Sequence, residues 1–165
     1  MSTHTIVDSP IGELTVVADD GVVTGLYFPR HWTRPDREKF GPRGDHGFAA
    51  VTQQLKEYFA GERTRFDVPT RAAGDDFQHA VWAEIATVPY GGTTTYGDIA
   101  TALGDRSLAR EVGAAVGSNP LSLLVACHRV VGKDGKLTGY AGGLARKRFL
   151  LDLERPAAEE RGQLW

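Results

Sequence analysis

The chain has 165 residues, of which 41% are hydrophobic and 24% charged, and its formal net charge is -2 at pH 7. These values are typical of a globular protein with one moderate core or two small ones, and they argue against a uniformly basic nucleic-acid-binding chain. Because no signal-peptide pattern opens the chain and no window approaches the roughly 18 apolar residues of a membrane span, we expect no membrane association and a reducing, cytoplasmic location.

The N-terminal region predicts a small α+β unit. Residues 5–28 alternate turn signals with short β-rich runs, which predicts an antiparallel hairpin or meander. Residues 29–47 are rich in Arg, Asp, Pro and Gly, and we expect a long polar loop that is either functional or mobile. Apolar residues then recur at helical spacing until Gly61 ends the pattern. The apolar positions of this helix are Phe48, Val51, Leu55 and Tyr58.

A connecting region separates this unit from the rest of the chain. Residues 63–74 predict a short strand around 66–68 and a connector, in which Pro69 and Gly74 mark a domain boundary. We therefore predict one domain over residues 1–73 and a second, mainly helical domain over residues 74–165.

The second domain opens with a predicted helix. Asp75 or Asp76 can cap it, and Pro89 prevents its continuation. We expect Trp82 in the core. The apolar face of this helix consists of Phe77, Val81, Ile85 and Val88.

Two short helices then predict a helix-turn-helix. Thr95 can cap the first, over residues 96–103, and Ser107 can cap the second, which carries Leu108, Val112, Ala115 and Val116 inward. Arg110 lies in the first turns of the second helix, where recognition helices present side chains to a groove.

Asn119 and Pro120 end that helix. The rest of the chain is predicted to contain an extended segment, a turn, a loop and a helix. We expect residues 121–125 to form a buried extended segment that carries Cys127 out of the core. Residues 133–136 predict a turn, residues 139–143 a flexible loop, and residues 144–154 a helix. The inward positions of this last helix are Phe149, Leu150 and Leu153.

Cys127 is the only cysteine, so an intrachain disulfide and a multi-thiolate zinc site are excluded. The thiol is therefore either inert packing or a nucleophile. His128 follows at once, and a nucleophile requires a base within reach and a third group that orients the base.

Positive charge gathers between residues 106 and 148, although the whole chain is slightly acidic. A polyanion can dock on such a patch, or the cations can simply solvate a helix. The cations are Arg106, Arg110, Arg129, Lys133, Lys136, Arg146, Lys147 and Arg148, against Glu111 and Asp134.

Seven motifs together closely resemble the O6-alkylguanine-DNA alkyltransferases. They are DFQ (76–78), VPYG (88–91), TYGDIA (95–100), AREVG (109–113), NP (119–120), CHRV (127–130) and LTGYAGG (137–143). The resemblance covers the whole C-terminal half. It implies an α+β fold with a small N-terminal ribonuclease H-like domain and a mainly helical C-terminal domain.

The resemblance implies direct repair of double-stranded DNA that contains alkylated guanine. The protein would flip the base out of the duplex and take the alkyl group irreversibly onto Cys127, because no second thiol can remove it. Neither a metal nor an organic cofactor is implied, since the damaged DNA is itself the alkyl donor. A monomer is expected, and clustering on DNA, alkyl-group size and activity on O4-alkylthymine are left open.

The resemblance also assigns catalytic roles. His128 would take the thiol proton through a bridging water, and Glu154 would hold His128. Asn119 would brace the active-site turn, and Tyr96 would donate a hydrogen bond to the departing base.

The same resemblance assigns the residues that meet the substrate. Tyr140 would wall the alkyl pocket. The other expected pocket residues are Val130, Ala141 and Gly142, and the expected DNA contacts are Arg110, which would fill the space left by the flipped base, Tyr96, Gly97 and Lys133.

Two positions depart from the family pattern. Ala126 stands where a proline usually precedes the cysteine, and Glu111 stands where a small residue is usual. Three rival functions stay open: an alkyltransferase-like sensor that binds damaged DNA without chemistry, a helix-turn-helix regulator, and a cysteine hydrolase, which would need an oxyanion hole.

Overall fold

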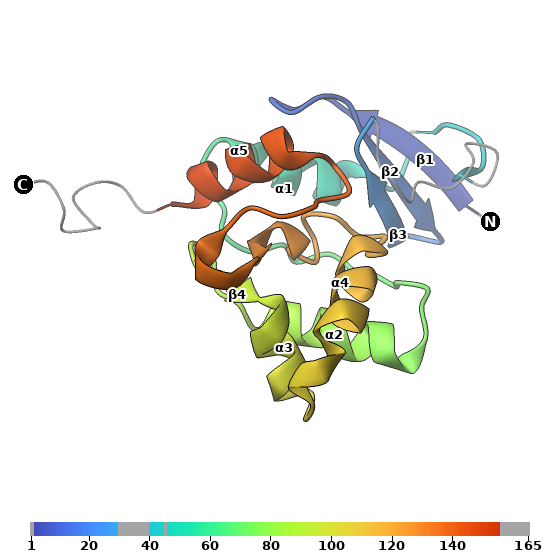
Figure 1. Cartoon of the computed structure of the whole chain (residues 1–165). Helices are drawn as coiled ribbons and strands as arrows, with labels where there is room; N and C mark the ends of the chain where they lie inside the picture. The colour runs from blue at the N-terminus through green and yellow to red at the C-terminus, as the bar shows by residue number, and fades with distance from the viewer. Residues whose placement is uncertain (1, 30–39, 45, 156–165) are drawn as a thin grey trace, which may run out of the picture.

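The computed structural model describes residues 2–29, 40–44 and 46–155. Figure 1 shows a small sheet and α1 in the upper part of the view, α2, α3 and α4 in the lower part, and α5 near α1. Buried apolar residues of both halves form one continuous core. No helix in the described ranges is long and apolar enough to cross a bilayer.

The N-terminal sheet is an antiparallel meander, as predicted. It consists of β1 (Ser2–Val7), β2 (Leu14–Asp19) and β3 (Val22–Tyr27), in the order β1-β2-β3. Asp20 and Gly21 form the tight β2–β3 turn with φ values of 50° and 82°. The predicted polar loop lies mostly outside the described residues, but Phe40 at its described end stacks on Tyr27.

Helix α1 (Ala49–Phe59) buries one face in the core, as its apolar spacing predicts. The strand predicted around residues 66–68 is wrong. The Asp67 backbone N–H donates to Gln54 Oε1 at 2.8 Å, and its carbonyl accepts from Gln54 Nε2 at 3.1 Å. The side chain of Gln54 therefore satisfies the backbone groups that a strand would have paired.

Helix α2 (Asp76–Ala86) begins with a capping box between Asp75 and Gln78, which confirms one of the two predicted caps. Val88 lies beyond the end of this helix. The indole of Trp82 is 4% exposed and donates to the Ala115 carbonyl at 2.9 Å, so it connects α2 to α4 as part of the core.

The predicted pair of short helices is present. Thr95 caps α3 (Tyr96–Ala102), as expected. The prediction that Ser107 caps the second helix is wrong, because Asp105 accepts hydrogen bonds from both the backbone N–H and the hydroxyl of Ser107. Asp105 thereby begins a 3-10 turn, η2 (Arg106–Leu108), and α4 (Ala109–Gly117) follows without a side-chain cap.

Residues 121–125 form a tight turn, so the predicted extended segment is wrong. Leu123 has φ 71°, and the Val125 N–H donates to the Leu121 carbonyl at 2.8 Å. Cys127 therefore stays inside the core, on the 3-10 turn η3 (Cys127–Arg129). Strand β5 (Val130–Val131) then pairs in parallel with β4 (Thr94–Thr95), next to the start of α3.

A 3-10 turn, η4 (Lys133–Gly135), occupies the predicted turn, and α5 (Leu144–Glu154) has its predicted bounds. Phe149 was predicted to point inward but is 36% exposed. The buried stripe instead runs through Lys147, Leu150 and Glu154, which share one helical face at spacings of three and four.

Candidate active site

The turn that carries Cys127 is clamped by Asn119. Asn119 Nδ2 donates to the Val125 carbonyl at 2.9 Å, and Asn119 Oδ1 accepts from the Leu121 N–H at 2.9 Å. The amide thus bonds to both ends of the tight turn before the cysteine. These two hydrogen bonds fix the backbone segment that leads into Cys127. The Cys127 residue itself is 3% exposed.

His128 and Glu154 form a buried pair from different parts of the chain. His128 Nε2 and Glu154 Oε2 lie 2.7 Å apart, and each side chain is 1% exposed. An ionised carboxylate only accepts hydrogen bonds, so Nε2 carries the proton that is shared with Glu154. In neutral His128 the Nδ1 lone pair is then available, and Nδ1 is buried without a hydrogen-bond partner in the described structure.

Glu154 is held ionised by its neighbours. Tyr58 Oη donates to Glu154 Oε2 at 2.5 Å, and Arg129 donates Nε to Oε1 at 2.7 Å and Nη2 to Oε2 at 3.1 Å. Burial opposes ionisation, but hydrogen bonds from His128 and Arg129 outweigh it and lower the pKa of Glu154 to about 2. Glu154 is therefore a fixed anion at neutral pH.

The Cys127 thiol needs help to ionise. Burial raises its pKa, while the nearby Asn119 amide, the charge of Lys147 and the nearby Tyr140 hydroxyl act in the opposite direction. Burial likewise lowers the pKa of His128 despite the adjacent carboxylate, so the imidazole is neutral and able to accept a proton.

Lys147 is a buried cation that the sequence analysis placed on the surface. It is 1% exposed, and its Nζ donates to the carbonyls of Val130 at 2.6 Å and Thr138 at 3.3 Å. Burial lowers the pKa of Lys147 to about 8, and the Cys127 thiolate acts against this shift. Arg129 also points inward, toward Glu154, so the proposed cationic patch loses two of its members.

A largely apolar cavity of about 410 Å³ lies between α3, α4 and the loop before α5. Its lining residues are Tyr96, Ala109, Arg110, Gly113, Val116, Gly117, Thr138, Gly139, Tyr140 and Ala141. Burial and then the charge of the Cys127 thiolate raise the pKa of Tyr140 well above its usual value. Tyr140 thus lines the cavity and interacts electrostatically with the thiol.

Two expected pocket residues do not line this cavity. Val130 is fully buried in β5, where its carbonyl accepts from Lys147. Gly142 packs against Phe28, because a Cβ at this position would come within 2.4 Å of the ring.

The expected DNA contacts differ in their relation to the cavity. Arg110 is exposed on α4 and lines the cavity, and Tyr96 lines it from the first turn of α3. Gly97 follows Tyr96 on α3 and is half-buried. Lys133 is exposed on η4 and does not line the cavity.

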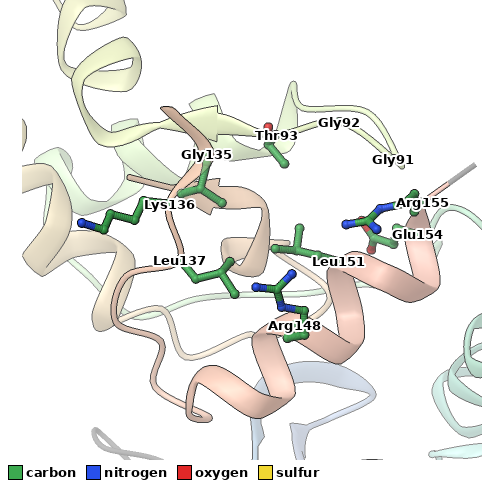
Figure 2. Close-up of a pocket in the computed structure, with 11 residues that line it drawn as sticks. Gly91, Gly92, Thr93, Gly135, Lys136, Leu137, Arg148, Leu151, Glu154 and Arg155 are labelled. Carbon is green, nitrogen blue, oxygen red and sulfur yellow. The ribbon is translucent and has the colours of Figure 1, made fainter. Parts of the chain in front are cut away.

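A second cavity of about 430 Å³ lies between α5, the turn at residues 91–93 and residues 135–137. Figure 2 shows Arg148 extending from α5 toward Leu137 and Leu151, whereas Lys136 points away from them. No cysteine or histidine lines it. Within the described residues, no group of three or more His, Cys, Asp or Glu side chains could hold a metal ion.

Sequence reasoning missed Lys147, Tyr58 and Arg129 as members of the site. Lys147 occupies an apolar position of the α5 periodicity, three residues before Leu150, and this misplaced charge was the available signal. Tyr58 and Arg129 gave no such signal, because their role depends on the position of Glu154 in space.

Comparisons with known proteins point to one family. The profile described as "6-O-methylguanine DNA methyltransferase, DNA binding domain" matches residues 76–156, and that of its ribonuclease-like domain matches residues 3–72. The chain is 46% identical over 159 residues to the methylated-DNA--protein-cysteine methyltransferase of Mycobacterium tuberculosis (strain ATCC 25618 / H37Rv), covering 96% of this chain and 95% of the relative. The constitutive protein of that description in Bacillus subtilis (strain 168) is 38% identical over 167 residues, covering 98% of this chain and all of the relative.

Solved structures agree with the sequence comparisons. The crystal structure of Mycobacterium tuberculosis OGT in complex with DNA has a TM-score of 0.86 and 45% identity, and the match covers 92% of each chain. An O6-methylguanine DNA methyltransferase from Methanococcus jannaschii has a TM-score of 0.66 and 28% identity, with 92% of this chain and 93% of that chain covered. The predicted mixed fold class is thereby confirmed.

Proposed function

Because the chain belongs to the 6-O-methylguanine DNA methyltransferase family, we propose that it takes the alkyl group of O6-alkylguanine in double-stranded DNA onto its own Cys127. It is a DNA-repair methyltransferase of the protein-cysteine type, and its residues must account for thiol activation, base capture and departure of the purine. The observation that carries the residue assignment is the His128–Glu154 pair at 2.7 Å with Nδ1 of His128 left available.

Thiol activation begins with proton transfer from Cys127 to His128 Nδ1 through a bridging water. The imidazolium that forms keeps its Nε2 proton and donates it in a hydrogen bond to the Glu154 carboxylate. The negative charge of Glu154 favours the charged ring. The buried Lys147 cation stabilises the thiolate, and Asn119 holds the turn that aims it. A carboxylate fixed by Tyr58 and Arg129 needs no rearrangement when the imidazole becomes charged.

Alkyl transfer is then a displacement at saturated carbon. The bond between Cys127 Sγ and the alkyl carbon forms as the bond from that carbon to guanine O6 breaks, and the electron pair moves onto the purine. Tyr96 donates a hydrogen bond to the departing purine anion. The net result is an S-alkylated Cys127 and a guanine that has gained the proton the thiol lost.

The cavity beside Tyr140 supports a flipped-base substrate. Its position between α3, α4 and the loop before α5 gives it aromatic walls from Tyr96 and Tyr140. A base reaches such a site only outside the duplex stack, and Arg110 at the cavity lining is placed to fill the space that the base leaves. DNA binding and the reacting groups are thus assigned to the predicted domain of residues 74–165, and Tyr58 from the predicted domain of residues 1–73 supports Glu154.

Each protein molecule acts once. A thioether on the only cysteine has no second thiol to receive the alkyl group, and the reaction requires no cofactor. We propose a monomer as the active species, because each chain carries a complete set of the reacting groups. A reactive single thiol is suited to a reducing compartment, which supports a cytoplasmic location.

Mass spectrometry tests the proposal directly. The protein is incubated with a duplex that contains one O6-methylguanine, and its intact mass and Cys127 peptide are measured. We expect the mass of one methyl group on Cys127 and guanine in the DNA. A lesion that persists in tightly bound DNA, with Cys127 unmodified, would contradict the proposal and favour a non-catalytic sensor.

A further inference from the structure

Two side chains from distant parts of the chain meet in the wall of the cavity beside Tyr140. Thr138 Oγ1 donates a hydrogen bond to Tyr96 Oη at 3.1 Å, across 42 positions of sequence. Both residues line the cavity. Tyr96 begins α3, and Thr138 lies in the loop before Tyr140, so the bond joins two walls of the cavity.

The Thr138 hydroxyl has a fixed direction. A Cβ added to Gly132 would lie 2.9 Å from Thr138 Cγ2, so the absence of a side chain at Gly132 makes room for this methyl group. The Thr138 carbonyl accepts from the buried Lys147 Nζ at 3.3 Å. A β-branched side chain has few χ1 rotamers, so with its methyl group against Gly132 the hydroxyl faces Tyr96.

This hydrogen bond determines where the Tyr96 proton points. A phenolic hydrogen lies in the plane of the ring, on one of two sides of the oxygen. With the Thr138 donor on one side, the Tyr96 hydrogen takes the other side. Accepting a hydrogen bond also polarises the phenol and strengthens it as a donor.

We propose that Thr138 is a positioning residue for alkyl transfer, whose hydroxyl holds the Tyr96 phenol so that its hydrogen points at the departing purine. The inference rests on the proposed function, in which Tyr96 donates to that base. A donor that is aimed before the reaction stabilises the purine anion without reorganisation. A Tyr96 phenol without the Thr138 bond populates both directions, and only one of them serves the reaction.

A purely structural role for the same bond makes a different prediction. A bond that only ties the loop to α3 contributes to stability or to DNA affinity. Its loss would lower the melting temperature or weaken DNA binding and leave transfer within the bound complex unchanged. The transfer rate at saturating DNA, measured separately from the Kd, therefore distinguishes the two roles.

The test compares Thr138→Val, Thr138→Ser and Tyr96→Phe, each alone, with the double variant Tyr96→Phe/Thr138→Val. Thr93→Val is the matched control, because Thr93 is exposed and lines the other cavity. Single-turnover transfer from an O6-methylguanine duplex is followed at saturating DNA, the Kd is measured by titration, and folding is checked by thermal melting.

We expect Thr138→Val to slow saturating transfer by about 3- to 10-fold, the value of one hydrogen bond, with an unchanged Kd. Thr138→Ser keeps the hydroxyl but loses the methyl group that directs it, so its rate should lie between those of wild type and Thr138→Val, whereas Thr93→Val should transfer at close to the wild-type rate. In the Tyr96→Phe background, Thr138→Val should cause no further slowing, because the phenol it positions is gone.

Three results would overturn the inference: a Thr138→Val rate equal to wild type, a Thr138→Ser rate as low as that of Thr138→Val, or equal slowing by Thr138→Val with and without the Tyr96 hydroxyl. The wild-type protein in the same experiment tests the proposed function by itself. Absence of transfer by wild type contradicts the proposed function, whereas transfer without a Thr138 effect contradicts only this inference.

Discussion

The two sides of the catalytic turn differ in how their buried polar atoms are satisfied. On the carboxylate side, Glu154 accepts hydrogen bonds from Tyr58, His128 and Arg129. On the thiol side, His128 Nδ1 and Tyr140 Oη are buried and make no hydrogen bond in the described part of the chain. Buried polar atoms without partners are uncommon in folded proteins. The carboxylate side is therefore fixed by hydrogen bonds, and the thiol side contains the His128 nitrogen that we propose accepts the thiol proton.

On the thiol side, the largest expected effect on alkyl transfer is that of the Cys127→Ala substitution. Cys127→Ala should abolish alkyl transfer, because the chain has no other thiol, while the protein still binds alkylated duplex. Transfer is measured by protein mass and binding by gel shift. Residual methylation of the variant protein would show that the acceptor is a different residue.

On the carboxylate side, Glu154→Gln replaces the buried anion by a neutral amide. This change leaves the Arg129 charge buried without its anion, and we expect the free energy of unfolding to fall by about 3–5 kcal/mol. Chemical denaturation measures the loss, with exposed Glu13→Gln as the matched control. If Glu154→Gln lowered the free energy of unfolding by no more than Glu13→Gln does, Glu154 would not be the anion that compensates the buried Arg129 charge.

Glu154 also gives the wild-type protein a specific pH dependence. Its pKa is lowered from 4.5 to about 2 in the folded state, so the unfolded chain binds the proton more readily. The stability from this group is complete above pH 4.5 and is lost as the pH falls toward 2. The difference in stability between wild type and Glu154→Gln should shrink over this window, as measured by denaturation at each pH.

On the thiol side, Lys147→Met tests whether the buried Lys147 cation stabilises the Cys127 thiolate. Removing the cation raises the pKa of Cys127, so the single-turnover rate should reach its plateau at higher pH than in wild type. Exposed Lys56→Met is the matched control. An unchanged pH profile for Lys147→Met would show that Lys147 only holds the carbonyls of Val130 and Thr138.

The smallest expected effect is that of Ala126→Pro, which restores the family's usual residue. Ala126 has φ -78°, which lies within the range of proline. We expect a gain of about 0.4–1 kcal/mol in unfolding free energy, because the unfolded chain loses freedom. Asn119 already clamps the turn, so the transfer rate should stay close to that of wild type. A large gain in rate would show that Ala126 leaves the thiol poorly aimed.

Local chemistry explains which parts of the fold were predictable from the sequence. The meander, the Asp75 and Thr95 caps and the bounds of α5 each depend on a few neighbouring residues. Two of the errors arise where local signals compete. Asp105 displaces Ser107 as a cap, and a positive φ at Leu123 folds a segment whose apolar residues favoured extension.

The site divides in the same way. The adjacent Cys127 and His128 are visible in the sequence, and the resemblance of seven motifs identified the family, which the comparisons confirm. Tyr58 reaches Glu154 across 96 positions, and no local pattern encodes that contact. Lys147 gave one local signal, its place three residues before Leu150, but the arginines on both sides favoured a solvated surface.

The tautomer of His128 is the most direct test of how the thiol is activated. Nitrogen-15 NMR of the imidazole, assigned by comparison with His128→Gln, reports which ring nitrogen carries the proton at neutral pH. The account predicts a neutral ring with its proton on Nε2, toward Glu154, and a free Nδ1. A proton on Nδ1 at that pH, in either the other neutral tautomer or an imidazolium, would contradict it.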